Sequence, residues 1–211
     1  MIMLGLALGF VLGVAGTSGA GQVNNTDLSI PFLGGSDTDQ HFAVETNGGV
    51  EVGLRATLGN GAVVIPTEYI YAVQTGYQIS PSNYANWNFD WSVEIENNDG
   101  YQLSFSFDYD PSPAIRYQYL LSNANFGSSP AVGQYSGNYG LFLFPSPFTF
   151  NADLNATYDI VLSVFSPNSP TVPVASSHIQ VVVGQVPEPA TMFLLGLGLV
   201  GLAGARRKFR S

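Results

Sequence analysis

The sequence predicts an all-β body, a two-layer antiparallel β-sandwich, placed between two apolar ends. Apolar and polar residues alternate in several segments, which is the pattern of half-buried strands. Gly, Pro, Asn and Ser interrupt the chain at roughly the spacing expected for short strands and tight turns. No comparable helical period occurs between the ends. Sheets with one apolar face usually pack in two layers, and both an immunoglobulin-like and a jelly-roll topology fit this pattern.

Nine segments of the body are predicted as strands. Alternation is clearest in residues 50–58, 89–95 and 101–109, where every second side chain is apolar. The remaining predicted strands are residues 40–45, 67–74, 115–121, 140–144, 157–165 and 175–183. Aromatic and β-branched residues, which favour strands, are frequent in these segments.

The segments on either side of Gly100 are predicted to form a hairpin. A three-residue loop, 98–100, places Gly100 at the left-handed position of a bulge and matches the apolar faces of both strands. The predicted cross-strand pairs are Ile95–Leu103, Val93–Phe105 and Trp91–Phe107.

This register also predicts a cluster of carboxylates on the polar face. Asp90 would lie opposite Asp108, with Asp110 two residues further on. Directly opposed like charges are destabilising, and calcium prefers clustered carboxylate oxygens. A calcium site at these three residues is therefore one hypothesis. The alternative is that the strands splay there and water screens the charges.

The N-terminal end has the features of a signal peptide. Residues 1–16 are apolar, and Ser18 and Ala20 are small residues that fit the −3 and −1 positions of a signal-peptidase site. Cleavage is predicted after Ala20, which makes residues 1–20 a signal helix and residues 21–186 the β-sandwich ectodomain. No Lys or Arg precedes the apolar core, so an apolar first strand or core helix is the alternative.

The C-terminal end has three parts in a fixed order. Pro187, Glu188 and Pro189 come first, and the apolar stretch 190–205 follows, which at 1.5 Å per residue spans about 24 Å. The basic tail, residues 206–211, contains four of the six basic residues of the chain: Arg206, Arg207, Lys208 and Arg210. These charges act as a cytoplasmic stop behind a transmembrane helix, so the ectodomain is expected outside the inner membrane.

This arrangement resembles the PEP-CTERM sorting signal of Gram-negative bacteria, over residues 187–211. The resemblance implies that an exosortase cuts near the motif of Pro187, Glu188 and Pro189, after signal peptidase has acted at the other end. It further implies an inner-membrane-anchored precursor, delivery to the cell surface or extracellular matrix, and a setting of exopolysaccharide or biofilm production. The alternative is a simple tail anchor, in which the proline-rich segment only precedes the transmembrane helix.

Composition excludes several classes of function. The chain has no cysteine, which rules out disulfides and thiolate chemistry. Residues 21–186 carry fourteen acidic against two basic residues, a net charge of −12. Nucleic-acid binding needs clustered Lys and Arg, so it is not expected.

The search for catalytic residues gives little, and an enzyme is not expected. His41 and His178, the two histidines, belong to no spaced metal motif. Glu94 and Glu96 share a strand face and could hydrolyse glycosides, but a solvated face explains them equally well. The alternative function is a carbohydrate-binding, lectin-like module that uses exposed tyrosines to stack sugars or the hypothesised calcium site to bind them. The tyrosines are Tyr69, Tyr71, Tyr117 and Tyr119.

Overall fold

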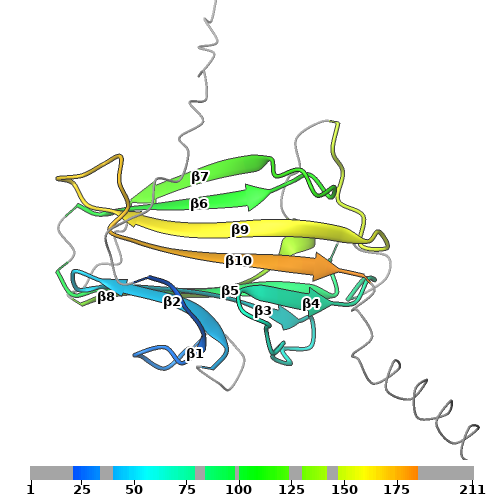
Figure 1. Ribbon diagram of the computed structural model, residues 1–211, viewed down its shortest axis with the longest axis horizontal. Coiled ribbons are helices and arrows are strands. Elements are labelled where there is room, and N and C mark those ends of the chain that lie inside the picture. Colours follow the sequence, from blue (N-terminus) through cyan, green and yellow to red (C-terminus); the bar gives the residue numbers. More distant parts are fainter. Residues whose placement is uncertain are drawn as a thin grey trace, which may run out of the picture.

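The computed structural model describes residues 21–33, 40–78, 84–97, 100–123, 130–141 and 147–184. These residues form ten strands in two five-stranded sheets, and the sheets lie face to face (Figure 1). One short 3-10 helix, η1 (Tyr139–Leu141), follows the eighth strand. The predicted signal helix and transmembrane helix lie outside the described residues. Within the described ranges, no helix is long and apolar enough to cross a membrane.

The first sheet contains mainly the N-terminal half of the body. Its order is β1 (Val23–Thr26), β2 (Phe42–Asn47), β3 (Val50–Leu58), β5 (Trp87–Ile95) and β8 (Ala131–Asn138). The second sheet has the order β4 (Ile70–Val73), β10 (Ala175–Val183), β9 (Ala156–Phe165), β6 (Gln102–Asp108) and β7 (Tyr117–Asn123). All neighbouring strands named here run antiparallel except β4 and β10, which are parallel, so the second sheet is mixed and not wholly antiparallel as predicted.

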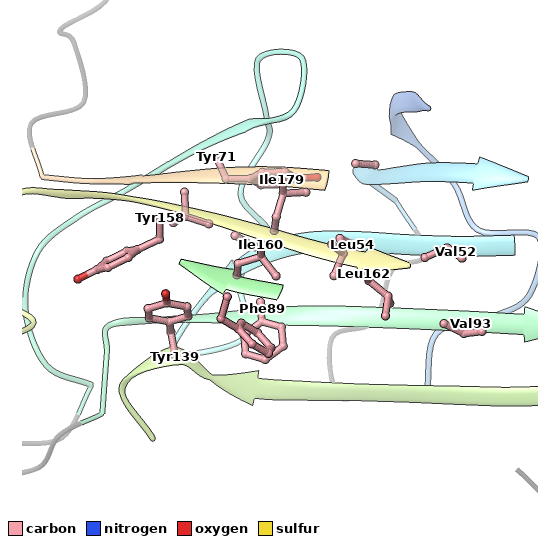
Figure 2. Close-up of a cluster of buried hydrophobic side chains, with 14 of the residues drawn as sticks. Val52, Leu54, Tyr71, Phe89, Val93, Tyr139, Tyr158, Ile160, Leu162 and Ile179 are labelled. Atoms are coloured by element: carbon pink, nitrogen blue, oxygen red, sulfur yellow. The ribbon is translucent and has the colours of Figure 1, made fainter. Parts of the chain in front are cut away.

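The main core lies between the two sheets. Leu54 and Val93 of the first sheet are fully buried in one cluster with Ile160 and Leu162 of the second. Figure 2 shows the aromatic end of this cluster, where Tyr139 lies beside Phe89 and Tyr158. Burial of this kind is the main stabilising term in a sandwich, and it confirms the predicted inward faces of β3 and β5. The expectation of half-buried strands is wrong for β3, because its outward residues, such as Arg55, are buried as well.

The predicted hairpin at Gly100 is wrong. Gly100 does have a positive φ of 76°, but the chain crosses there from β5 in the first sheet to β6 in the second. The predicted pairs therefore do not exist within a sheet. Trp91 instead meets Phe105 across the core, edge to face, with ring centroids 5.3 Å apart. Alternation determined which face each residue occupies, and it could not tell a hairpin from a crossover.

Two further differences concern strands. Residues 139–141, at the start of the predicted strand 140–144, form η1, and residues 142–146 lie outside the described residues. The strands β1 and β8 were not predicted. β8 lacks an apolar alternation because two of its inward positions are Gly133 and Gly137. At Gly137 a Cβ would lie 2.9 Å from Cζ of Phe89, so the neighbouring ring occupies the space of a side chain.

Side chains close the seam between the sheets at β2 and β10. The carbonyl of Val174 accepts from Asn47 Nδ2 at 2.8 Å, and the N–H of Ser176 donates to Glu45 Oε2 at 2.9 Å. Gln22 binds both backbone groups of His178, accepting from its N–H at 2.7 Å and donating to its carbonyl at 2.9 Å. Polar side chains thus replace a neighbouring strand along the first half of β10.

Candidate functional site

The three carboxylates of the predicted calcium site do not form one site. Asp90 belongs to β5 in the first sheet, whereas Asp108 and Asp110 lie at the end of β6 in the second. The predicted opposition of Asp90 and Asp108 required the hairpin that the fold lacks. Among the residues that the structure describes, no group of three or more His, Cys, Asp or Glu side chains is placed to hold a metal ion.

Asp90 is already neutralised by a buried arginine. Its Oδ2 lies 2.9 Å from Nε of Arg55, and both side chains are almost completely buried. Burial raises the pKa of Asp90, and hydrogen bonds from Ser136, Arg55 and Thr57 act in the opposite direction. The cation that balances Asp90 is therefore part of the protein, which leaves no need for a calcium ion at this carboxylate.

A segment that we call the N-terminal strap, residues 28–33, covers this ion pair on the outer face of the first sheet. Leu28 and Phe32 of the strap pack with Phe42 and Val44 in a second, smaller core cluster. The guanidinium of Arg55 lies 5.1 Å from the ring centroid of Phe32 and 4.3 Å from that of Phe42. The outer face of this sheet is thus partly a second core.

Polar contacts fasten the strap to the sheet. The Ser29 N–H and hydroxyl lie 3.0 and 2.9 Å from Glu51 Oε1, and the same hydroxyl lies 2.9 Å from Glu94 Oε2. The side chain of Gln134 binds the Leu33 N–H and the Pro31 carbonyl. Glu94, one of the two glutamates considered for hydrolysis, is therefore engaged in holding the strap, while Glu96 lies beyond the end of β5.

Asp108 and Asp110 build the connection between β6 and β7. Oδ1 of Asp108 accepts from the N–H groups of Asp110 at 3.1 Å and Arg116 at 2.8 Å. Asp110 accepts from the N–H of Ser112 at 3.0 Å and pairs with Arg116 at 3.2 Å. Burial raises the pKa of Asp108 to about 6. These contacts give both carboxylates a structural role.

A polar cluster on the outer face of the second sheet was not predicted. Nε2 of His178 lies 2.5 Å from Asp159 Oδ1, and Gln180 Nε2 donates to Asp159 Oδ2 at 3.2 Å. The ring of Tyr69 packs on the His178 ring with centroids 5.1 Å apart. The alternation of His178 and Gln180 was visible in the sequence, but the pairing of Gln180 with Asp159 was not, since it depends on register.

The four tyrosines considered for sugar stacking do not share one face. Tyr71 is fully buried in the core, and its hydroxyl donates to the carbonyl of His41. Tyr69 is half-buried against His178. Tyr117 and Tyr119 lie together on β7, with ring centroids 6.1 Å apart, and Tyr119 is exposed. Of these four tyrosines, Tyr117 and Tyr119 on β7 are therefore the pair best placed for stacking on a ligand.

The described body ends directly before the C-terminal motif. Gly184 follows β10 with a φ of 125°, and its N–H donates to the carbonyl of Val73 at 2.9 Å. A Cβ at this position would lie 2.2 Å from Asn155 Oδ1, so only glycine fits. At the other end Gly21 is exposed, and Gln22 is the first residue fastened to the second sheet. Ala20, Pro187, Glu188, Pro189 and the basic tail lie outside the described residues.

Comparison with protein families identifies the C-terminal motif. Residues 185–208 match the model of the PEP-CTERM protein-sorting motif. The chain carries a PEP-CTERM sorting signal. The match includes Pro187, Glu188 and Pro189, and it starts one residue after Gly184. A PEP-CTERM signal implies an exported protein with a membrane-anchored precursor and exosortase-type processing. No curated protein matches the chain.

Proposed function

We propose that this PEP-CTERM protein is a non-enzymatic component of the cell surface or extracellular matrix, with a role in exopolysaccharide or biofilm production. Its C-terminal helix holds the precursor in the membrane until an exosortase cuts near Pro189. The observation that carries this proposal is the boundary at Gly184, which lies between the end of β10 at Val183 and the start of the sorting motif at residue 185. Cleavage within the motif leaves every strand of the sandwich in place.

The internal contacts of the acidic residues support a structural role. Asp90 is paired with Arg55, Asp108 and Asp110 bind backbone N–H groups, and Glu94 binds Ser29. A general acid or base must be able to reach a substrate. The oxygens of these carboxylates are instead engaged by other groups of the protein.

The carbohydrate-binding alternative has narrower support. It rests on Tyr117 and Tyr119, since Tyr71 is buried and Tyr69 is packed against His178. Asp90 lies in a different sheet from Asp108 and Asp110, so the hypothesis of a calcium site at these three residues gives this alternative no support, and stacking and hydrogen bonds would have to hold the sugar.

The intact mass of the chain in each cell fraction tests the proposal. We expect the precursor in the inner membrane, and a product outside it that lacks residues 1–20 and the segment after about Pro189. Glu188→Gln should leave the unprocessed chain in the membrane, because the motif has one carboxylate for recognition. Pro170→Ala, in an exposed loop of the body, is the matched control and should be processed normally. A wild-type chain with its C-terminus intact in the membrane would favour the simple tail anchor.

A further inference from the structure

The two sides of the sandwich end in different kinds of edge strand. β1 and β4, on one side, have four residues each, and the pairing of β1 shifts register near Asn25, whose φ is 56°. β7 and β8, on the other side, have seven and eight residues and pair continuously with β6 and β5. Short or irregular edges resist pairing with other chains, whereas long regular edges invite it.

β7 and β8 lie on the same side because of how the sheets stack. At the seam, β2 adjoins β10. Beyond the next strands, β3 and β9, β5 faces β6 through Trp91 and Phe105. The strands beyond β5 and β6 are β8 and β7. Among the described residues, no strand pairs with the outer edge of either one. We call the pair of strands β7 and β8 the neutral edge.

The neutral edge lies in a long uncharged part of an otherwise acidic chain. Residues 117–152 contain no Asp, Glu, Lys, Arg or His, while residues 21–186 together carry a net charge of −12. Neither strand contains proline, and neither has an irregular register. The strands also expose apolar area, with exposed fractions of 62% for Tyr119, 44% for Leu120, 39% for Val132 and 58% for Tyr135. The devices that usually protect an edge are therefore missing from these two strands.

We propose that the neutral edge is the surface through which two copies of this chain associate, strand to strand. A two-fold axis perpendicular to the sheets would pair β7 with β7 and β8 with β8 of the second copy, both antiparallel. Such a contact uses the same surface on both partners and satisfies the backbone groups of each edge. It would extend each five-stranded sheet into a ten-stranded one.

The distribution of charge favours a second copy of this chain as the partner at the neutral edge. Two bodies of −12 repel each other wherever their acidic surfaces meet, and the neutral edge is where they can approach without that cost. A cationic partner would instead be attracted to the acidic parts of the surface, which this edge lacks. Anchoring of the precursor also holds copies in one membrane, where a modest pairing energy is effective because the local concentration is high.

The absence of cysteine makes the test direct, since a single introduced cysteine is the only thiol. Residues facing each other in antiparallel strands have Cα atoms about 4.5 to 5.5 Å apart, which suits a disulfide. We would place cysteines at Tyr119 and Leu120 in β7 and at Tyr135 and Ser136 in β8, one per variant, in the full chain produced in cells that export it. Leu154→Cys and Val172→Cys, at sites 48% and 53% exposed and outside the neutral edge, are the matched controls.

After mild oxidation, we expect a disulfide-linked dimer from at least one cysteine in the neutral edge, at a yield roughly tenfold above both controls. The double variant Tyr119→Glu/Tyr135→Glu, combined with Leu120→Cys, should lower the yield by a similar factor, because like charges would then meet. Tyr119→Phe/Tyr135→Phe in the same background should keep the dimer, which separates the charge effect from the loss of a side chain.

Two results would overturn the proposal. The first is that neutral-edge cysteines give no more dimer than Leu154→Cys and Val172→Cys, which indicates random collision in the membrane. The second is that the glutamate variant dimerises as well as the wild-type background while its near-UV circular dichroism shows a folded body. A crosslinked product of a mass other than twice the chain would point to a different partner and would also count against it.

Discussion

The buried pair of Arg55 and Asp90 allows the sharpest stability prediction. Arg55→Met removes the cation but keeps most of the apolar volume. Asp90 would then remain buried with only neutral partners, among them Thr57 at 3.5 Å. Breaking a buried ion pair from one side costs about 3 to 5 kcal/mol. For a protein of this size, each kcal/mol corresponds to about 2 to 4 °C in Tm, so we expect a loss of roughly 6 to 20 °C.

A double variant separates the pair from its surroundings. Arg55→Met/Asp90→Leu replaces both charges with apolar groups, and such replacements of buried pairs are often neutral or stabilising. We therefore expect the double variant to recover most of the Tm that Arg55→Met loses. The assay is thermal unfolding of the full chain in one detergent, followed by near-UV circular dichroism, where Trp87 and Trp91 report on the core.

Arg116→Met is the matched control, because Arg116 is the other basic residue of the body and its side chain is mostly exposed in its pair with Asp110. Exposed pairs contribute little to stability, so the Tm of this variant should stay close to that of the wild type. The reasoning is refuted if Arg55→Met unfolds within about 2 °C of the wild type, or if the double variant is as unstable as the sum of its two single variants.

Two further predictions concern β6 and the end of β10. Burial raises the pKa of Asp108 from its ordinary value of 3.8 to about 6, so the folded state binds this proton more tightly than the unfolded state. Stability should therefore fall as pH rises from about 4 to 6. Asp108→Asn keeps the acceptor for the N–H groups of Asp110 and Arg116 but should flatten that fall, and a Tm series that keeps the wild-type slope would exclude Asp108 as its source. Gly184→Ala should lower the stability by more than about 1 kcal/mol, because its Cβ would collide with Asn155 at a positive φ. Gly21→Ala, where nothing lies within 4 Å of the added Cβ, should leave the Tm unchanged, and equal stability of the two glycine variants would contradict the steric argument.

The faces of the strands were predictable from the sequence, and their partners were not. The alternation in residues 50–58 and 89–95 correctly assigned Leu54 and Val93 to the core. The same alternation is compatible with any neighbouring strand whose apolar face points the same way. Thus the crossover at Gly100 was predicted as a hairpin, and the supposed opposition of Asp90 and Asp108 followed from that error.

The residues that contact the candidate carboxylates could not be predicted either, because alternation does not show which strands are neighbours. Arg55 and Asp90 are 35 positions apart and meet only because β3 and β5 are neighbours in that register. Gly137 gave no strand signal, because the ring of Phe89 on the next strand fills the space that a side chain would occupy. The sorting motif, by contrast, was predicted correctly, since its recognition depends on a local order of residues and not on tertiary contacts.

The position of β10 also controls when the body can finish folding during export. β10 is the last strand that the structure describes, yet it lies inside its sheet between β4 and β9. Its first half is bound by Gln22, Glu45 and Asn47 from the beginning of the body. These contacts require residues 174–178, and β10 is complete only at Val183, two residues before the sorting signal begins. A chain halted earlier has unpaired edges at β4 and β9 that proteases can attack. A truncated chain without β10 would lack the centre of its second sheet, and we expect it to be more sensitive to proteolysis than the complete body.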